Sequence, residues 1–180
     1  APVQWLVQFS PYGVYESRHV LTAITALLGV VATWKMAAAI AGERAGFLGA
    51  LILSLTPCWV GHGLFNPKDI PFASAAAFAS LAAVRLAMGP APLRVRDMCW
   101  AGLTVGIALG VRAGGNFVVA YPCLAAGLRL GLEAVRRHRA RQPLWLGWLT
   151  LNLVTCVYLV FLIAWPLMLL FWPWAQIDPF

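Results

Sequence analysis

Charged side chains are scarce in this sequence, and acidic ones are the rarest. Lys, Arg, Asp and Glu together make up 11% of the 180 residues, with only six acidic residues, whereas hydrophobic residues make up 62%. A globular domain in water carries about a quarter of charged residues. The composition therefore excludes an ordinary soluble domain, and the mean hydropathy of +0.80 indicates that lipid surrounds most of the chain.

The sequence also lacks the spacings that mark metal, redox and repeat proteins. Its four cysteines, Cys58, Cys99, Cys123 and Cys156, lie in different apolar stretches, with no CxxC and no Cys/His ligand pattern. A free cysteine behaves as a small hydrophobe, so we expect all four in the helical core. No internal repeat is visible, which argues against a transporter built from two similar halves.

Both ends lack the features of a complete membrane protein. The chain begins Ala-Pro-Val-Gln, without a Met or a signal region, and it stops at Asp178-Pro179-Phe180 directly after an apolar stretch. We therefore expect a fragment or a processed piece of a longer product.

What the sequence does contain is a series of long apolar runs bounded by charge, proline or glycine. A membrane span needs about 20 apolar residues, so the chain has room for roughly six. The predicted spans cover residues 20–41, 45–64, 71–88, 98–111, 115–132 and 144–172. The predicted fold is thus all-α and integral to the membrane, a single transmembrane domain over residues 1–180 with short loops.

Arginine is distributed unevenly over the loops of this topology. One side receives nine arginines: Arg44, Arg85, Arg94, Arg96, Arg129, Arg136, Arg137, Arg139 and Arg141. The other side receives Arg18, Lys68 and Arg112. Because cytoplasmic loops retain Lys and Arg, we expect the arginine-rich loops to be cytoplasmic, in a bacterial inner membrane.

The net charge of +7 is therefore mostly a signal of topology. The cluster Arg136 to Arg141 also suits contact with anionic lipid headgroups. It is short and contains no interleaved aromatic residues, so we do not expect nucleic acid as a partner.

The loops on the other side hold most of the unusual polar residues. They are Glu16, Arg18, His19, His62, Asn66, Lys68, Asp69, Arg112 and Asn116. Ionisable groups at membrane depth usually face a partner or a cavity. This side is therefore the predicted functional face.

The densest of these loops is the segment 61–72. Asp69 is predicted at or near the N-cap of the span that begins at Pro71, with Lys68 beside it. A carboxylate, an ammonium and a helix N-terminus suit a phosphate, or a hard cation together with phosphate. The structural alternative is that Asp69 caps the helix and Lys68 anchors it at the membrane interface.

An ordered set of short motifs runs through the first half of the chain. In order they are Arg18-His19, Gly42-Glu43-Arg44-Ala45-Gly46-Phe47-Leu48, Thr56-Pro57, His62 and Asn66-Pro67-Lys68-Asp69-Ile70-Pro71. This order resembles the early membrane core of polyprenyl-phosphate-dependent glycosyltransferases. These are the protein mannosyltransferases and lipid A aminoarabinose transferases, which are family 39-like members of the glycosyltransferase C superfamily. Asp69 and Pro71 match an Asp and a Pro of that pattern, and the stretch 106–115 is similar to the family's next inner segment.

The resemblance implies an inverting transfer of a sugar from a polyprenyl phosphate to an acceptor at the extracytoplasmic membrane face. Negative charge on the leaving phosphate would be stabilised by Lys68, Arg18 and Arg112. A divalent cation, Mg, Mn or Ca, would lie near Asp69. His62 and Asn66 would hydrogen-bond oxygens of the sugar or phosphate. Alternatively, both arginines only flank membrane spans.

The chain departs from the family pattern at the catalytic acid. The family places that acid in an outer loop after an earlier span, and no such segment precedes Ala1 here. Glu16 lies where that loop would end, so the catalytic residue stays unassigned and we expect the chain alone to be inactive. The alternative function is an accessory or structural subunit, with other membrane subunits as partners; there His19 and His62 could ligate the metal of a pigment.

Overall fold

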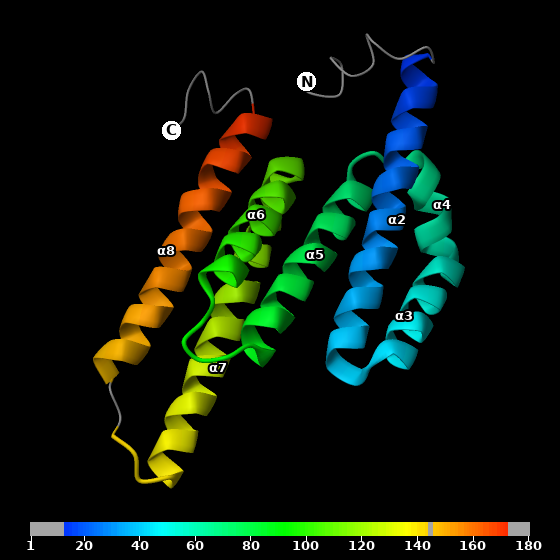
Figure 1. The fold of residues 1–180 in the computed structure, drawn as a ribbon. Coiled ribbons are helices and arrows are strands. Elements are labelled where there is room, and N and C mark those ends of the chain that lie inside the picture. The colour runs from blue at the N-terminus through cyan, green and yellow to red at the C-terminus, as the bar shows by residue number, and fades with distance from the viewer. Residues whose placement is uncertain (1–12, 144–145, 173–180) are drawn as a thin grey trace.

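The computed structural model describes residues 13–143 and 146–172, and this part of the chain is helical throughout, without strands (Figure 1). Its elements are α2 (Val14–Ala41), α3 (Glu43–Leu55), α4 (Pro57–Phe65), α5 (Asp69–Met88), α6 (Val95–Val111), the 3₁₀ segment η1 (Ala113–Val119), α7 (Ala120–Arg139) and α8 (Leu146–Phe171). The predicted all-helical class is confirmed.

Four of these helices are long and apolar enough to cross a membrane, and the number is five if α3 and α4 form one broken span. The four are α2, α5, the helix over Gly115–Arg139 and α8. Helix α6 has 17 residues, about 25 Å of helix, which is the lower limit for crossing the hydrocarbon core. The predicted count of about six spans therefore stays a prediction.

Most predicted boundaries lie within a few residues of the observed ones. Helix α2 begins six residues before the predicted start at 20, and α7 continues to Arg139 rather than ending at 132. The start of the predicted span 144–172 lies outside the described residues. The predicted span 45–64 corresponds to two helices, α3 and α4, which together form one candidate broken span.

That span breaks at Thr56-Pro57, where α3 and α4 meet at an angle of 65°. Pro57 is the first residue of α4, a position where its missing N–H costs nothing, and it keeps Thr56 out of the helical conformation. Thr56 satisfies two carbonyl groups at the break: its N–H donates to Leu53 O at 3.1 Å and its hydroxyl to Ile52 O at 2.8 Å. The bend is thus encoded locally and leaves α4 inclined to α3.

The helices pack as two groups on either side of α5 (Figure 1). Helices α2, α3 and α4 form the first group, and the Ser74 hydroxyl of α5 donates to Thr25 O of α2 at 2.7 Å. Helices α6, α7 and α8 form the second group. Buried apolar residues fill it in two clusters, one around Leu86, Met98 and Val160 and the other around Val105 and Ala164.

The closest helix contact of the second group is that of α6 with α8. Gly102, Gly106 and Gly110 lie four residues apart on the face of α6 that meets α8. A Cβ at Gly106 would lie 2.9 Å from Ala164 Cα and 3.0 Å from its carbonyl oxygen. Small residues at this spacing let two helix backbones approach in lipid. The Trp172 indole closes the contact by donating to Gly110 O at 3.1 Å.

The helix ends fall into two sets at opposite ends of the bundle (Figure 1). The start of α2, the α4–α5 turn and the α6–η1 junction share one end, which we call the polar-network end. The α2–α3, α5–α6 and α7–α8 connections share the other. The nine arginines that the sequence assigns to one side all belong to this arginine-rich end; even Arg129, in the middle of α7, donates there to Gly89 O at 2.6 Å.

The glycine contact generates a stability prediction. Gly106→Ala should lower the free energy of unfolding by about 1–3 kcal/mol, because the new methyl group meets the backbone of α8 and can be relieved only by moving a helix. Gly127→Ala in α7 is the matched control, since a Cβ there meets nothing within 4 Å. Unfolding in mixed micelles with increasing SDS measures both. Equal stability of the two variants would contradict the close contact.

Candidate functional site

An ion pair joins two loops at the polar-network end of the bundle. Arg112, the residue that ends α6, places Nη1 2.7 Å from Oδ1 of Asp69, the first residue of α5. The two side chains are 59% and 57% exposed, so water and headgroups screen the pair and it stabilises the fold by about 1 kcal/mol at most. Its main effect is to hold a guanidinium at a fixed place.

Asn66 is the centre of the hydrogen bonds around this ion pair. Its Nδ2 donates to Asp69 Oδ2 at 2.9 Å, and its Oδ1 accepts the backbone N–H groups of Lys68 at 3.2 Å and Asp69 at 3.0 Å. The residue follows α4 directly and precedes Pro67, which cannot donate to an extended helix. Asn66 thus satisfies the first amides of α5, a common role of asparagine in turns.

His62 extends the network into α4. Its Nδ1 lies 3.3 Å from Asn66 Nδ2. An amide nitrogen donates hydrogen bonds, so Nδ1 of His62 is the acceptor in this contact. We call His62, Asn66, Asp69 and Arg112 the polar network.

A cavity of about 350 Å³ lies beside the polar network, in the elbow that the broken span forms with α5. It is lined by Leu53, Thr56, Cys58, Trp59, His62, Asn66, Asp69, Ile70 and Ala73. The volume lies within the range of small-molecule sites, about 300–1,000 Å³. Polar groups occupy one end and apolar side chains the rest, so the cavity suits a molecule with a polar head and an apolar tail.

One side chain of this cavity differs from what the sequence predicts, and another carries an unpaired polar group. Cys58 is exposed and not in the core; Cys156 alone of the four cysteines is buried. The buried Nε1 of Trp59 has no hydrogen-bond partner among the described residues. An unpaired buried indole N–H is costly, and here it belongs to a side chain that lines the cavity.

The structure brings together four of the six predicted phosphate- and sugar-binding residues, namely the members of the polar network. Lys68 is next to them through its backbone, and its side chain is exposed. Arg18 lies on α2 with an exposed side chain, and no contact in the described part of the chain joins it to the network. The binding roles of all six stay predictions.

The alternative that Asp69 caps its helix is wrong. Lys68 is the N-cap of α5, and no side chain caps that helix from the N-cap position. One carboxylate oxygen of Asp69 contacts Arg112 and the other accepts from Asn66. Asn66, and not Asp69, accepts from the free amides.

His19 and Glu16 have contacts of a structural kind. The Nδ1 of His19 contacts Leu64 O, and its ring packs edge-on between Tyr15 and Phe65, with centroids at 4.3 and 5.1 Å. The ring therefore attaches the start of α2 to the end of α4. Glu16 accepts the N–H of Gly13 at 3.1 Å and supports the start of α2.

The donor groups at this end do not by themselves make a divalent cation site. No group of three or more His, Cys, Asp or Glu side chains converges within residues 13–143 and 146–172. Asp69 would supply one carboxylate, and both of its oxygens already accept hydrogen bonds. Because Ca²⁺ and Mg²⁺ need six or more oxygen ligands, substrate and water would have to supply the others. The divalent cation stays a prediction, and no step below depends on it.

The hydrogen bonds of Asn66 generate a prediction for the site. Asn66→Ala should lower the free energy of unfolding by about 1–2 kcal/mol, because two amides and the Asp69 carboxylate lose their partner. The control is Lys68→Ala. Lys68 contacts Asn66 only through its backbone N–H, so loss of its side chain should change the free energy of unfolding by no more than about 0.5 kcal/mol. Thermal unfolding in detergent compares them. A loss as large in Lys68→Ala would refute the central position of Asn66.

Comparison of the chain with protein-family models, with curated proteins and with solved structures finds no match. The resemblance to polyprenyl-phosphate-dependent transferases therefore depends on the order of the motifs alone.

Proposed function

We propose that this chain is the donor-binding membrane core of a glycosyltransferase that moves a sugar from a polyprenyl phosphate to an acceptor at the extracytoplasmic face. One observation carries the proposal: Asp69, which lines the polar end of a mostly apolar cavity, forms an ion pair with the Arg112 guanidinium beside that cavity. A lipid-linked phosphate has the same division into an anionic head and an apolar chain.

The charges around the cavity support a phosphate ligand. Arg112 carries five N–H donors, and the contact with Asp69 Oδ1 uses the Nη1 group. The other donors suit phosphate oxygens, which guanidinium binds in a bidentate manner. The exposed Lys68 ammonium precedes the first turn of α5, where a helix N-terminus attracts anions. Two cations and one carboxylate leave a net positive charge for the phosphate.

The apolar surface around the cavity supports a long hydrocarbon chain. A second groove of about 280 Å³ lies between α2 and the broken span, and Trp59 lines both spaces. Leu27, Val30 and Val60 are among the residues that line the groove. A polyprenyl chain that passes Trp59 would continue from the cavity into this mostly apolar groove, in which Ser54 is the polar side chain.

The chemistry assigns clear roles to the cations. The acceptor oxygen forms a bond to the anomeric carbon while the bond from that carbon to the phosphate oxygen breaks, and the phosphate leaves with the electron pair. Arg112 and Lys68 stabilise the charge that develops on the phosphate. The acceptor's proton needs a base, and Asp69 is bound by Arg112. The base must then come from a further segment or subunit, so the chain alone binds donor without turning it over.

In this proposal the arginine-rich end faces the cytoplasm of a bacterial inner membrane, and the polar network faces the extracytoplasmic side. The nine arginines at one end support this orientation through the retention of cations in cytoplasmic loops. The donor and acceptor would then meet at the outer membrane boundary.

A binding experiment tests the donor site. The protein in phosphatidylcholine nanodiscs should bind undecaprenyl phosphate, and Arg112→Gln should weaken binding about 10- to 100-fold, as expected for the loss of hydrogen bonds to a charged group. Arg44→Gln, an exposed arginine at the other end, controls for net charge. Binding that is absent in the wild type, or unaffected by Arg112→Gln, would exclude the proposal.

Cysteine labelling tests the orientation. In a cysteine-free background, Lys68→Cys should react with a membrane-impermeant maleimide added to spheroplasts, and Arg141→Cys should react only after the membrane is opened. Both positions are exposed, so access to the reagent depends on the side of the membrane. The reverse pattern would invert the proposed topology.

A non-catalytic subunit of a larger membrane complex is the second candidate, favoured by one specific observation. Both oxygens of Asp69 are bound within the chain, as expected if the network serves to hold α4, α5 and α6 together. A structural clip predicts that Arg112→Gln impairs assembly with partner subunits while neither variant nor wild type binds undecaprenyl phosphate. The nanodisc experiment therefore separates the two candidates.

A further inference from the structure

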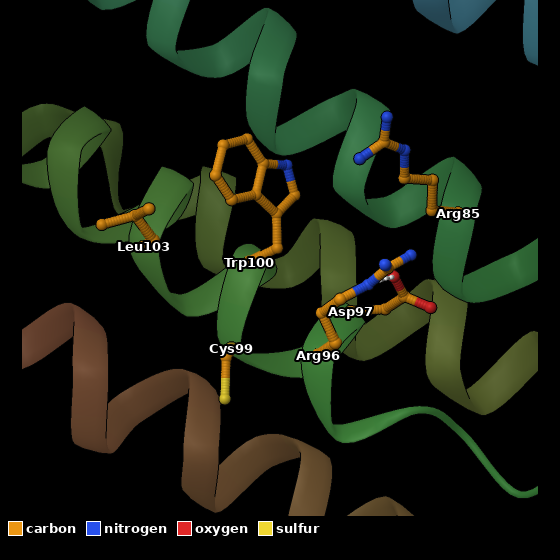
Figure 2. A pocket seen from close by; sticks show the side chains of 6 residues that line it. All are labelled: Arg85, Arg96, Asp97, Cys99, Trp100 and Leu103. Carbon is orange, nitrogen blue, oxygen red and sulfur yellow. Dashed lines mark ion pairs between the residues drawn. The ribbon is translucent and has the colours of Figure 1, made fainter.

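The arginine-rich end contains a basic groove that the proposed transfer does not use. A cavity of about 400 Å³ lies between α5 and α6 and is lined by Arg85, Arg96, Asp97, Cys99, Trp100 and Leu103 (Figure 2). A neighbouring depression of about 570 Å³ is also lined by Arg85, Arg96 and Asp97, together with Arg94 and the end of α5. We call the two together the basic groove.

The groove carries an excess of positive charge. Three arginines face one carboxylate, and the ion pair in the groove, Arg96 Nε to Asp97 Oδ1, is long at 3.9 Å. The Arg96 side chain is 85% exposed, whereas that of Asp97 is 13% exposed. The first turn of α6 adds the positive end of a helix, and its N-cap makes no side-chain hydrogen bond. The groove therefore favours an anion.

An apolar wall continues from the charged end along α6. Trp100 lies one turn beyond Arg96 and Leu103 two turns beyond, about 10 Å deeper along the helix. In Figure 2 the indole of Trp100 projects from α6 toward α5, and the side chain of Arg85 lies against α5. Trp100 and Ile107 are each 37% exposed on this helix. Tryptophan commonly lies at the level of lipid headgroups, so the groove passes from headgroup level into the hydrocarbon layer.

We propose that the basic groove binds one anionic glycerophospholipid of the leaflet at the arginine-rich end. Arg85, Arg94 and Arg96 contact its phosphate, and an acyl chain lies along Trp100 and Leu103. A free phosphate would use only the charged end and leave the apolar wall without a partner. The cluster Arg136 to Arg141 lies outside this groove, and its Arg137 is already engaged by Glu133 and by the ring of Trp148.

Native mass spectrometry of the whole protein in neutral detergent tests the site. Dioleoyl phosphatidylglycerol should bind as one tight equivalent, and dioleoyl phosphatidylcholine should not compete. Each arginine near an anionic headgroup contributes roughly fivefold in affinity, so Arg85→Gln with Arg96→Gln should weaken binding about 25-fold. The matched pair Arg139→Gln with Arg141→Gln removes equal charge at the same end and should change affinity less than about threefold.

A second variant should raise the affinity for phosphatidylglycerol, an effect that damage to the fold would not produce. Asp97→Asn removes the carboxylate of the groove and should tighten phosphatidylglycerol binding about fivefold. Trp100→Ala should weaken phosphatidylglycerol binding without affecting inorganic phosphate, the soluble probe for the charged end alone.

Three results would overturn the site. The first is an equal loss of phosphatidylglycerol affinity in the two arginine double variants, and the second is an unchanged affinity in Asp97→Asn. The third is binding of inorganic phosphate to the groove as tight as that of the lipid. The site is independent of the donor cavity. Arg112→Gln should leave phosphatidylglycerol binding unchanged, and the groove variants should leave undecaprenyl phosphate binding unchanged.

Discussion

The close contact of α6 with α8 determines the positions of both polar regions. Three glycines on one face of α6 let the two backbones approach to van der Waals distance, and the position of α6 along the bundle follows from that contact. One end of the helix then presents Arg112 to Asp69, and the other presents Arg96 and Asp97 to Arg85. Since α6 is only 17 residues long, a shift by one turn, about 5.4 Å, would separate both sets of partners.

At the polar-network end, different residues stabilise the fold and offer donors to a ligand. Asn66 satisfies the backbone at the start of α5, whereas the exposed pair of Asp69 and Arg112 contributes little to the fold. A guanidinium that is held but half exposed keeps donors for an incoming anion. The broken span is tolerated nearby because Thr56 bonds carbonyls that the break would otherwise leave unpaired.

Much of the helix order could be predicted from the sequence, because apolar runs and their charged boundaries are local. The long runs predict α2, α5, α7 and α8, and the arginine distribution predicts which loops share an end. Residues 45–64 are predicted as one span without a break, although Thr-Pro within an apolar run is the local signal for the break at Thr56. The glycine spacing 102, 106, 110 is equally visible, but nothing local identifies α8 as the partner.

The candidate site was only partly predictable for the same reason. Convergence of the outer loops follows from topology, so His62, Asn66, Asp69 and Arg112 could be grouped. The contact between Asp69 and Arg112 spans 43 residues and depends on how α5 and α6 pack, which the sequence pattern does not specify. The central role of Asn66 also went unrecognised, although asparagine between a helix end and a proline commonly bonds nearby amides. The function itself stays a proposal.

The bend of the broken span changes how far along the axis of α3 the turn after α4 lies. A straight continuation of α4 would rise about 13 Å along the axis of α3, given 1.5 Å per residue. Inclined by 65°, the same nine residues rise only about 6 Å. The Asn66–Asp69 turn therefore lies about 8 Å less far along the α3 axis than a straight helix would place it. The same bend forms the elbow that holds the cavity beside α5, so a straight span would leave His62 and Asn66 without that cavity.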